Sequence, residues 1–276
     1  MSQLTAADTD APLGVFDSGL GGLTVVRALR EALPSESIVY LGDTARVPYG
    51  TKGASTVIKY ALGCARHLVA RKVKAIIVAC NTVSAVAPER LRVELDIPVL
   101  GVIEPGARAA VAATRTGRIG VLATAGTIAS GAYPRAVAQV STRAEVIGQA
   151  APLLVPLAEE GWTAGEVPRL VVRRYIEPLA LARADVVLLG CTHYPLLREV
   201  IEAEVRARIG PDVAVVDSAT AMAAGVRDFL EARGMARKAT GAGVVQLLVT
   251  DLPRTFRETA ARFLGGEVGE VEQVDL

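Results

Sequence analysis

The segment GVFDSGLGGLTV, residues 14–25, decides how this chain folds. Its first residues, together with Leu13, form a short apolar run at residues 13–16, which predicts a buried strand. The glycines in its second half predict a turn, and the apolar spacing over residues 23–33 predicts a helix. A strand, a glycine-rich turn and a helix in this order open a β-α-β unit, in which helices join parallel strands.

The same alternation continues along the chain. Further short strands are predicted at residues 38–41, 73–79, 99–102, 117–122, 184–190, 213–216 and 244–249. Helical patterns of about 10–15 residues separate most of these strands. The alternation predicts an α/β fold with mainly parallel sheets.

A weak internal repeat bears on how the strands are grouped. GVFDS at 14–18 has a counterpart in GVLAT at 120–124, and ACNT at 79–82 has one in GCTH at 190–193. The matches are only a few residues long, so the sequence leaves open whether they are a coincidence or a structural repeat. A true repeat would place equivalent strand ends of two α/β lobes opposite one another.

Composition limits the class of protein. At about 100–200 residues per domain, 276 residues predict about two domains or one large one. The 51% hydrophobic content supports a sizeable core, and the net charge of +1 gives no electrostatic reason to expect a nucleic acid or an anionic membrane as a partner. The apolar runs fall far short of the ~20 residues of a membrane span, and no secretory signal is visible.

The three cysteines, Cys64, Cys80 and Cys191, cannot all pair, and free thiols suit a reducing cytoplasm. Cys64 lies inside a predicted helix, which favours inert packing. Cys80 and Cys191 each follow a predicted strand at the start of a helix, where unpaired N–H groups stabilise a thiolate or an anionic ligand. Ligands of open parallel sheets bind at such strand ends. Burial and a functional role both remain open for these two thiols.

Two further residues lie at strand ends. His193 is two residues from Cys191, where an imidazole could tune or deprotonate the thiol. The other histidine, His67, lies on a predicted amphipathic helix, which favours a packing or surface role for it. Asp17 could cap the turn that follows it, or it could assist proton movement near a thiol. Spacing alone does not separate these two interpretations.

Other cofactor sites fit less well. The pattern Gly19-x-Gly21-x-x-Thr24 with Asp43 downstream imitates a dinucleotide fingerprint, but Thr24 replaces its third glycine. No phosphate-binding P-loop pattern is present, and two histidines with isolated cysteines give no zinc spacing, so we expect no metal. No lysine lies in the strand-end clusters to hold pyridoxal. A nucleotide-binding regulatory module remains an alternative.

Six segments taken together resemble the glutamate racemases, which belong to the cofactor-independent aspartate/glutamate racemase family. The similarity runs from Leu13 to about Leu264. The resemblance implies two similar α/β lobes facing a central cleft, the first holding residues 1–103 plus 214–276 and the second residues 104–213. The matching segments are GVFDSGLGGLTV (14–25), GDTARVPYG (42–50), ACNTVSA (79–85), VIEPG (102–106), PLAEEG (156–161) and GCTHYP (190–195).

The resemblance also implies an activity and residue roles. The expected reaction is racemisation of glutamate without a cofactor, supplying D-glutamate for peptidoglycan and so for cell shape. Cys80 would take the Cα proton from D-glutamate, and Cys191 would take it from L-glutamate. Asp17 and His193 would assist these thiols, and Glu159 matches an acidic residue near the site.

Substrate contacts are implied in the same way. A racemase of the same family acting on aspartate or another acid is the nearest alternative, and a homodimer is compatible with the resemblance. The residues that match the substrate-binding positions are Asp17, Ser18, Tyr49, Gly50, Asn81, Thr82, Thr192 and His193.

The chemistry explains why two thiols are needed. A proton must leave one face of Cα and another must return to the opposite face, so a single fixed base cannot invert the centre. An ordinary cysteine, with a pKa near 8.5, is only a few per cent thiolate at neutral pH, so a neighbouring His or Asp matters. No arginine stands among the matched positions, so we expect hydroxyl, amide and backbone N–H groups to bind the carboxylates of glutamate.

Overall fold

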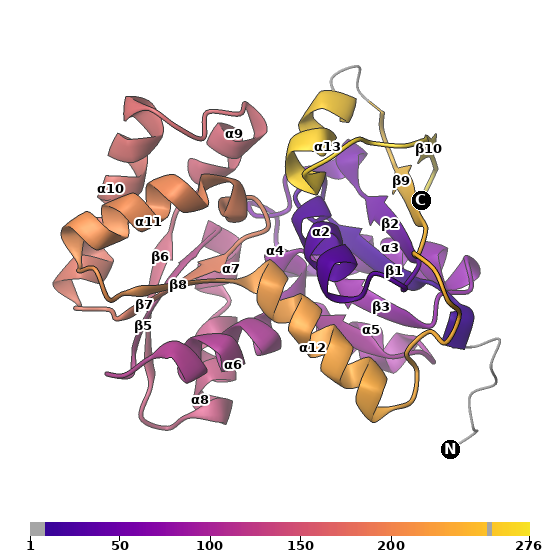
Figure 1. Cartoon of the computed structure of the whole chain (residues 1–276), viewed down its shortest axis with the longest axis horizontal. Coiled ribbons are helices and arrows are strands. Elements are labelled where there is room, and N and C mark those ends of the chain that lie inside the picture. The colour runs from indigo at the N-terminus through magenta and orange to yellow at the C-terminus, as the bar shows by residue number, and fades with distance from the viewer. Residues whose placement is uncertain (1–8, 253–255) are drawn as a thin grey trace.

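The computed structural model of the chain describes residues 9–252 and 256–276, so the first eight residues of the expected first lobe lie outside it. Two sheets form two α/β lobes that lie side by side (Figure 1). Every strand pair in both sheets is parallel. The predicted α/β class with two lobes of mainly parallel strands is confirmed.

The first sheet has the strand order β10-β9-β2-β1-β3-β4. Its strands are β1 (Leu13–Asp17), β2 (Ile38–Gly42), β3 (Ala75–Val78), β4 (Val99–Gly101), β9 (Val245–Val249) and β10 (Val271–Gln273). The helices around it are α2 (Leu23–Ala32), η1 (Thr44–Arg46), α3 (Ala54–Ala70), α4 (Asn81–Ser84), α5 (Pro88–Glu94), α12 (Ser218–Ala232) and α13 (Phe256–Leu264).

The second sheet has the order β6-β5-β7-β8. Its strands are β5 (Arg118–Ala123), β6 (Glu145–Ala150), β7 (Val186–Gly190) and β8 (Ala214–Asp217). The helices that cover it are α6 (Ile103–Ala113), α7 (Ala125–Ala129), α8 (Ala132–Val140), α9 (Leu154–Glu159), α10 (Glu166–Leu181), η2 (Tyr194–Leu197) and α11 (Arg198–Arg208).

The internal repeat corresponds to equivalent strands of the two sheets. The order β2-β1-β3-β4 in the first sheet matches β6-β5-β7-β8 in the second. The first pair of repeated segments falls on β1 and β5, and the second pair follows β3 and β7. The two lobes are therefore built alike, and Cys80 and Cys191 stand at equivalent strand ends.

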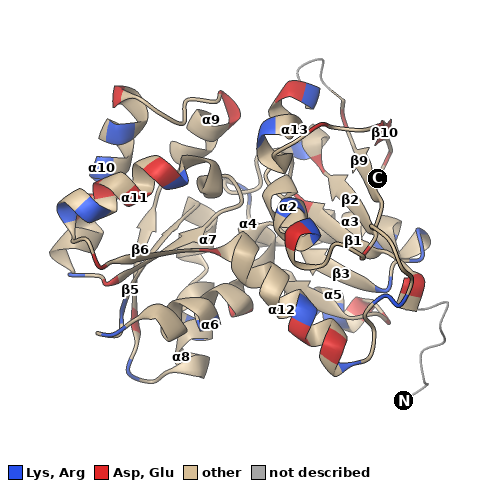
Figure 2. Ribbon diagram, in the orientation of Figure 1, with Lys and Arg blue, Asp and Glu red and all other residues tan. Residues whose placement is uncertain are grey.

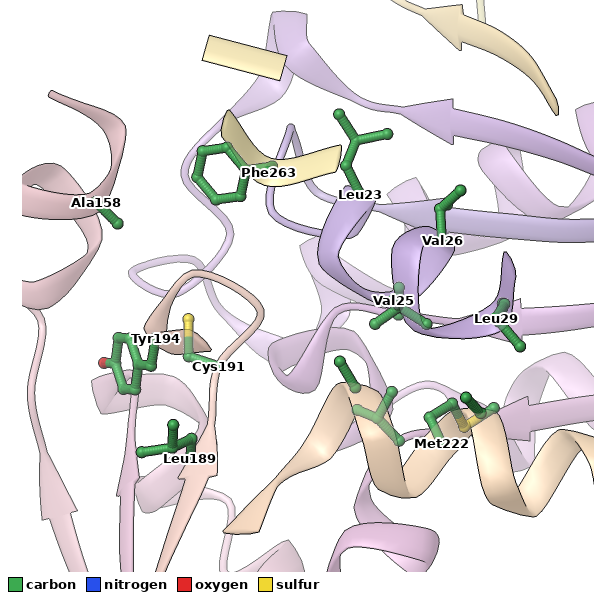
Figure 3. Close-up of a cluster of buried hydrophobic side chains, with 14 of the residues drawn as sticks. Leu23, Val25, Val26, Leu29, Ala158, Leu189, Cys191, Tyr194, Met222 and Phe263 are labelled. Carbon is green, nitrogen blue, oxygen red and sulfur yellow. The ribbon is translucent and has the colours of Figure 1, made fainter. Parts of the chain in front are cut away.

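A shared core joins the lobes. Strands β1, β3 and β7 are buried along their whole length, which explains why they read as continuous apolar runs. One apolar cluster connects Val25 and Leu29 of α2 with Met222 of α12 and reaches Leu189 and Cys191 of the second lobe (Figure 3). Each fully buried Leu or Val contributes about 1.5–3 kcal/mol relative to an exposed one, so this cluster holds the lobes together.

The boundary between the lobes differs from the expected one at one strand. β8 pairs with β7 in the second sheet, although the expected division assigned residues 214–217 to the first lobe. The chain returns to the first lobe with α12, which packs on α2 and on α6. We therefore propose a division that assigns residues up to Asp217 to the second lobe.

The surface carries charges of both signs. Arg and Glu occur together on each of the helices α10, α11 and α13 (Figure 2). This mixture agrees with the near balance of 30 basic and 29 acidic residues. None of the described helices is long and apolar enough to cross a membrane.

Candidate active site

All the predicted site residues except Asp17 line one cavity of about 350 Å³ between the lobes. It lies at the carboxyl ends of β1 and β3 on one side and of β5 and β7 on the other. A larger cavity of about 630 Å³, between α5, α6 and α12, contains none of the predicted residues. The smaller cavity is lined by Ser18, Gly19, Val47, Pro48, Tyr49, Gly50, Thr51, Cys80, Asn81, Thr82, Thr124, Ala125, Pro152, Val155, Pro156, Glu159, Cys191, Thr192 and His193.

Cys80 forms part of the first lobe's wall. It follows β3 and precedes α4, as the sequence predicts, and its Sγ lies 3.5 Å from Ser18 Oγ. The side chain is only 6% exposed. Burial raises the pKa of the Cys80 thiol to about 12, and the nearby Asp17 carboxylate acts in the same direction. Cys80 is therefore a protonated thiol at neutral pH.

Asp17 lies behind this wall and does not line the cavity. Its Oδ2 accepts a hydrogen bond of 3.1 Å from the Gly19 backbone N–H, so it does cap the turn. Its Oδ1 is buried and has no hydrogen-bond partner among the described residues. Burial raises the pKa of Asp17, although the charge of His193 opposes this rise. A buried carboxyl with a raised pKa and a free oxygen can hold a proton.

Cys191 forms the opposite wall together with His193. Its Sγ lies 3.8 Å from His193 Nδ1, and His193 Nε2 lies 3.0 Å from Glu159 Oε1. Burial alone lowers the pKa of His193, but the hydrogen bonds with Cys191 and Glu159 outweigh it and raise the pKa to about 10. The imidazole is therefore cationic at neutral pH, and a cationic imidazole beside a thiol stabilises a thiolate.

A cluster of hydroxyl groups spans the two lobes beside the thiols. Thr82 Oγ1 of the first lobe lies 3.0 Å from Thr124 Oγ1 of the second, which in turn lies 3.0 Å from Thr127 Oγ1. The sequence predicted Thr82 but not the other two. Thr124 could have been found, because the internal repeat aligns it with Ser18.

Asn81 is held from behind by two side chains that the sequence did not indicate. Tyr133 OH donates a hydrogen bond of 2.6 Å to Asn81 Oδ1, and Asn81 Nδ2 donates one of 3.2 Å to Ser218 Oγ. All three residues are buried. These bonds fix the orientation of the Asn81 amide in the cavity wall.

Tyr49 is anchored by a buried carboxylate. Its hydroxyl donates to Asp43, which also accepts a hydrogen bond of 2.6 Å from Arg46 Nε and one of 2.9 Å from Thr250 Oγ1. Asp43 is completely buried. This carboxylate therefore fixes the loop that carries Tyr49 and Gly50 over the cavity, and it is not free to bind the ribose of a dinucleotide.

The glycine-rich turn is likewise closed to a pyrophosphate. A methyl group on Gly21 would stand 2.5 Å from His193 Nδ1 and still closer to Thr192 Oγ1. The space that the glycines provide is thus filled by side chains of the second lobe. Among the described residues, no lysine or arginine lines the cavity, and no three His, Cys, Asp or Glu residues gather to hold a metal ion.

Comparisons with known proteins agree with this site. A family model described as Asp/Glu/Hydantoin racemase matches residues 23–226. The glutamate racemase of Geobacter metallireducens is 50% identical over 264 residues, 96% of each chain. That of Chlorobaculum tepidum is 46% identical over 269 residues, 97% of each chain.

Solved structures give the same result over almost the whole chain. The glutamate racemase of Francisella tularensis in complex with D-glutamate has a TM-score of 0.89 at 35% identity, covering 97% of this chain and 98% of that one. The Thermus thermophilus enzyme in complex with β-chloro-D-alanine has a TM-score of 0.86 at 44% identity, covering 98% of both chains. The chain belongs to the Asp/Glu/hydantoin racemase family, among the glutamate racemases.

Proposed function

We propose that the protein interconverts L-glutamate and D-glutamate without a cofactor, with Cys80 and Cys191 as the two acid/base groups. The observation that supports this most strongly is that both thiols line one cavity from different lobes. They are also close enough for the charge of Cys191 to raise the pKa of Cys80. A substrate between them would present one face of its Cα to each sulfur.

The charge states favour one starting form. Cys80 carries a proton, because burial raises its pKa to about 12, whereas the Cys191 sulfur lies 3.8 Å from Nδ1 of the cationic His193 imidazole. In this form Cys191 takes the Cα proton of L-glutamate, and Cys80 gives its proton to the opposite face to yield D-glutamate. This turnover leaves Cys191 protonated and Cys80 as a thiolate, the form in which Cys80 takes the Cα proton of D-glutamate and Cys191 gives its proton to the opposite face. Asp17, whose Oδ1 has no hydrogen-bond partner among the described residues, assists Cys80 in these proton transfers.

Neutral donors in the cavity would bind the two carboxylates of glutamate. Ser18, Thr82 and Thr192 offer hydroxyl groups, and Asn81 has an amide proton left after its bond to Ser218. Tyr49 and Gly50 complete the wall above them. These fixed dipoles stabilise the negative charge that develops at Cα, while each acid/base group contributes about 10²–10⁴-fold.

The test is proton exchange in deuterated water. Purified protein, free of pyridoxal phosphate, is incubated with L-glutamate, and D-glutamate carrying deuterium at Cα is the expected product. L-aspartate is run in parallel and should react far more slowly. Racemisation of aspartate at a comparable rate, or no deuterium at Cα of glutamate, would reject the proposed reaction.

Variants of the thiols test the assignment of roles. Cys80→Ser and Cys191→Ser should each abolish racemisation, because a serine hydroxyl is far too weak an acid to replace a thiol. Cys64→Ser is the matched control, since Cys64 is buried away from the cavity. Racemisation at the wild-type rate in either cavity variant would contradict the two-thiol mechanism.

The physiological role follows from the product. D-glutamate made here would be used in peptidoglycan, so the gene should restore growth of bacteria that require added D-glutamate. Three free cysteines suit a reducing compartment, and we place the enzyme in the cytoplasm. A reporter fusion that matures only outside the cytoplasm should stay inactive.

A homodimer is also part of the proposal. Leu153, Trp162 and Leu170 of the second lobe are each more than half exposed, which is unusual for large apolar side chains. A second copy of the chain could cover them. Light scattering after size exclusion should give a mass near twice 28.8 kDa, and Trp162→Glu should reduce it to that of the monomer.

A further inference from the structure

The glycine-rich turn of the first lobe contacts the second lobe at the segment that carries Cys191. Thr24 Oγ1 lies 2.9 Å from the carbonyl oxygen of Thr192 and 2.9 Å from that of Gly21. Gly21 packs so closely that a methyl group there would stand 2.5 Å from the His193 ring. Thr24 and Gly21 are both buried. The turn therefore packs closely against Thr192 and His193 and fixes their position.

The other sides of the His193 ring are also occupied. Its Nε2 faces Glu159 Oε1 at 3.0 Å, and its Nδ1 faces the Cys191 sulfur at 3.8 Å. The ring of Phe263, on α13, meets it edge-on with 5.1 Å between centroids. A displacement at Gly21 would therefore change the distance between His193 and Cys191, because Glu159 and Phe263 restrain the ring on its other protein-facing sides.

The next residue of the same turn faces the opposite wall. A methyl group on Gly22 would stand 2.5 Å from Asp17 Cβ and 3.0 Å from the Tyr40 ring. Asp17 lies beside Cys80 and raises its pKa. Neighbouring glycines of one turn thus contact the groups that accompany the two different thiols.

We propose that Gly21 and Thr24 are positioning residues that keep Cys191 and His193 at the distance and orientation that proton transfer requires. Gly22 does the same for Asp17 beside Cys80. This inference rests on the proposed function, because it assigns Cys191 to L-glutamate and Cys80 to D-glutamate. It explains the glycine-rich turn without a nucleotide.

Steady-state rates alone cannot test the proposal. The two enantiomers are equally stable, so kcat/KM must be the same in both directions whichever thiol is disturbed. Primary deuterium isotope effects distinguish the thiols, because each enantiomer labelled at Cα gives its deuteron to a different sulfur. If the Cys191 step becomes slower, the isotope effect on kcat/KM rises for L-[2-²H]glutamate. It falls toward unity for D-[2-²H]glutamate, whose labelled step then precedes the slow one.

The experiment compares variants of the turn. Gly21→Ala should lower kcat/KM by about tenfold or more and move the isotope effects in the stated directions. Gly22→Ala should move them in the opposite directions. Gly63→Ala, on α3, is the matched control, because a methyl group there meets nothing within 4 Å. It should leave rates and isotope effects unchanged.

Thr24 provides a milder test in case Gly21→Ala does not fold. Thr24→Val removes the hydroxyl that bonds to the Thr192 carbonyl and should lower kcat/KM by about two- to tenfold, with the isotope pattern of Gly21→Ala. Thr24→Ser keeps the hydroxyl and should restore both. Thermal melting of each variant shows whether it is folded.

The outcomes separate this inference from the proposed function. Equal shifts of the isotope effects in Gly21→Ala and Gly22→Ala, or unchanged isotope effects in Thr24→Val, would overturn the positioning roles while the wild-type protein still racemises glutamate. If the wild-type protein showed neither racemisation nor an isotope effect with either enantiomer, the proposed function itself would fail.

Discussion

The hydrogen bond from Tyr133 to Asn81 can be removed with little other change. Tyr133, on α8 of the second lobe, donates 2.6 Å to the amide oxygen of Asn81, at the start of α4 in the first lobe. Tyr133→Phe deletes only the hydroxyl. It leaves Asn81 Oδ1 buried without that donor and frees the amide to rotate about its remaining bond to Ser218.

The expected cost follows from this burial. A buried neutral acceptor that loses its partner costs about 1–3 kcal/mol in the free energy of unfolding. For a chain of this length 1 kcal/mol corresponds to about 2 °C, so Tm should fall by about 2–6 °C. The loosened Asn81 amide should also raise KM for glutamate by about three- to tenfold, with a smaller change in kcat.

Calorimetry and initial rates with both enantiomers measure these effects. Tyr175→Phe is the matched control, because its hydroxyl accepts only a long bond of 3.4 Å from the Leu153 backbone N–H at the surface. It should shift Tm by less than 1 °C. A Tyr133→Phe variant with the wild-type Tm and KM would refute the view that this bond orients Asn81.

Three further predictions concern other titratable groups. The raised pKa of His193, about 10 against an ordinary 6.5, adds stability that is complete below pH 6.5 and is lost as the pH rises through 10. Glu159→Gln should lower the His193 pKa and flatten this loss in urea unfolding between pH 6 and 10; an unchanged slope would contradict it. Cys64→Ala should keep kcat/KM within about twofold and cost about 1 kcal/mol, since Cys64 is packed away from the cavity; a tenfold loss of activity would give Cys64 a role. Lys74→Met should lower the free energy of unfolding, measured in urea, by about 3–5 kcal/mol. The variant leaves the carboxylate of the buried Glu36, whose Oε2 lies 2.6 Å from Lys74 Nζ, without its ion-pair partner. A loss below 1 kcal/mol would argue against a structural ion pair.

Buried strands could be predicted because burial on both faces makes each of their sequences a continuous apolar run. The runs at 73–79 and 184–190 correspond to β3 and β7, and each thiol follows its strand as expected. The edge strand β6 was not predicted, because its residues are exposed or half-buried and form no apolar run. Its existence depends on pairing with β5, which sequence pattern does not encode.

Prolines were a weaker guide to helix ends. Pro178 predicts a kink or a stop, yet α10 continues to Leu181. Pro178 lies in the last turn, so little of the helix follows the point at which its missing N–H interrupts the backbone bonding. Pro105 similarly lies in the first turn of α6, where its missing N–H has no helical partner to lose. Pro88 begins α5, which the separate turn α4 precedes.

Parts of the site could not be predicted from the sequence because they depend on contacts between segments that lie far apart in the chain. Thr127 meets Thr82, 45 residues away, and Ser218 meets Asn81, 137 residues away. The cluster at each strand end was visible, but its partner on the other wall was not. Glu159 was indicated only by resemblance, and its contact with His193 joins α9 to the loop after β7.

The second sheet comes from one uninterrupted stretch of chain, residues 118–217, whereas the first sheet needs strands from both ends. On the ribosome, the second lobe is therefore complete in sequence before β9 is made, and β2 waits until then as an unpaired edge. Phe263, which covers His193, and Arg262, which donates to the Glu159 carbonyl, are translated later still. A nascent chain thus carries both sulfurs long before the ribosome makes α13, the helix whose side chains pack against His193 and Glu159.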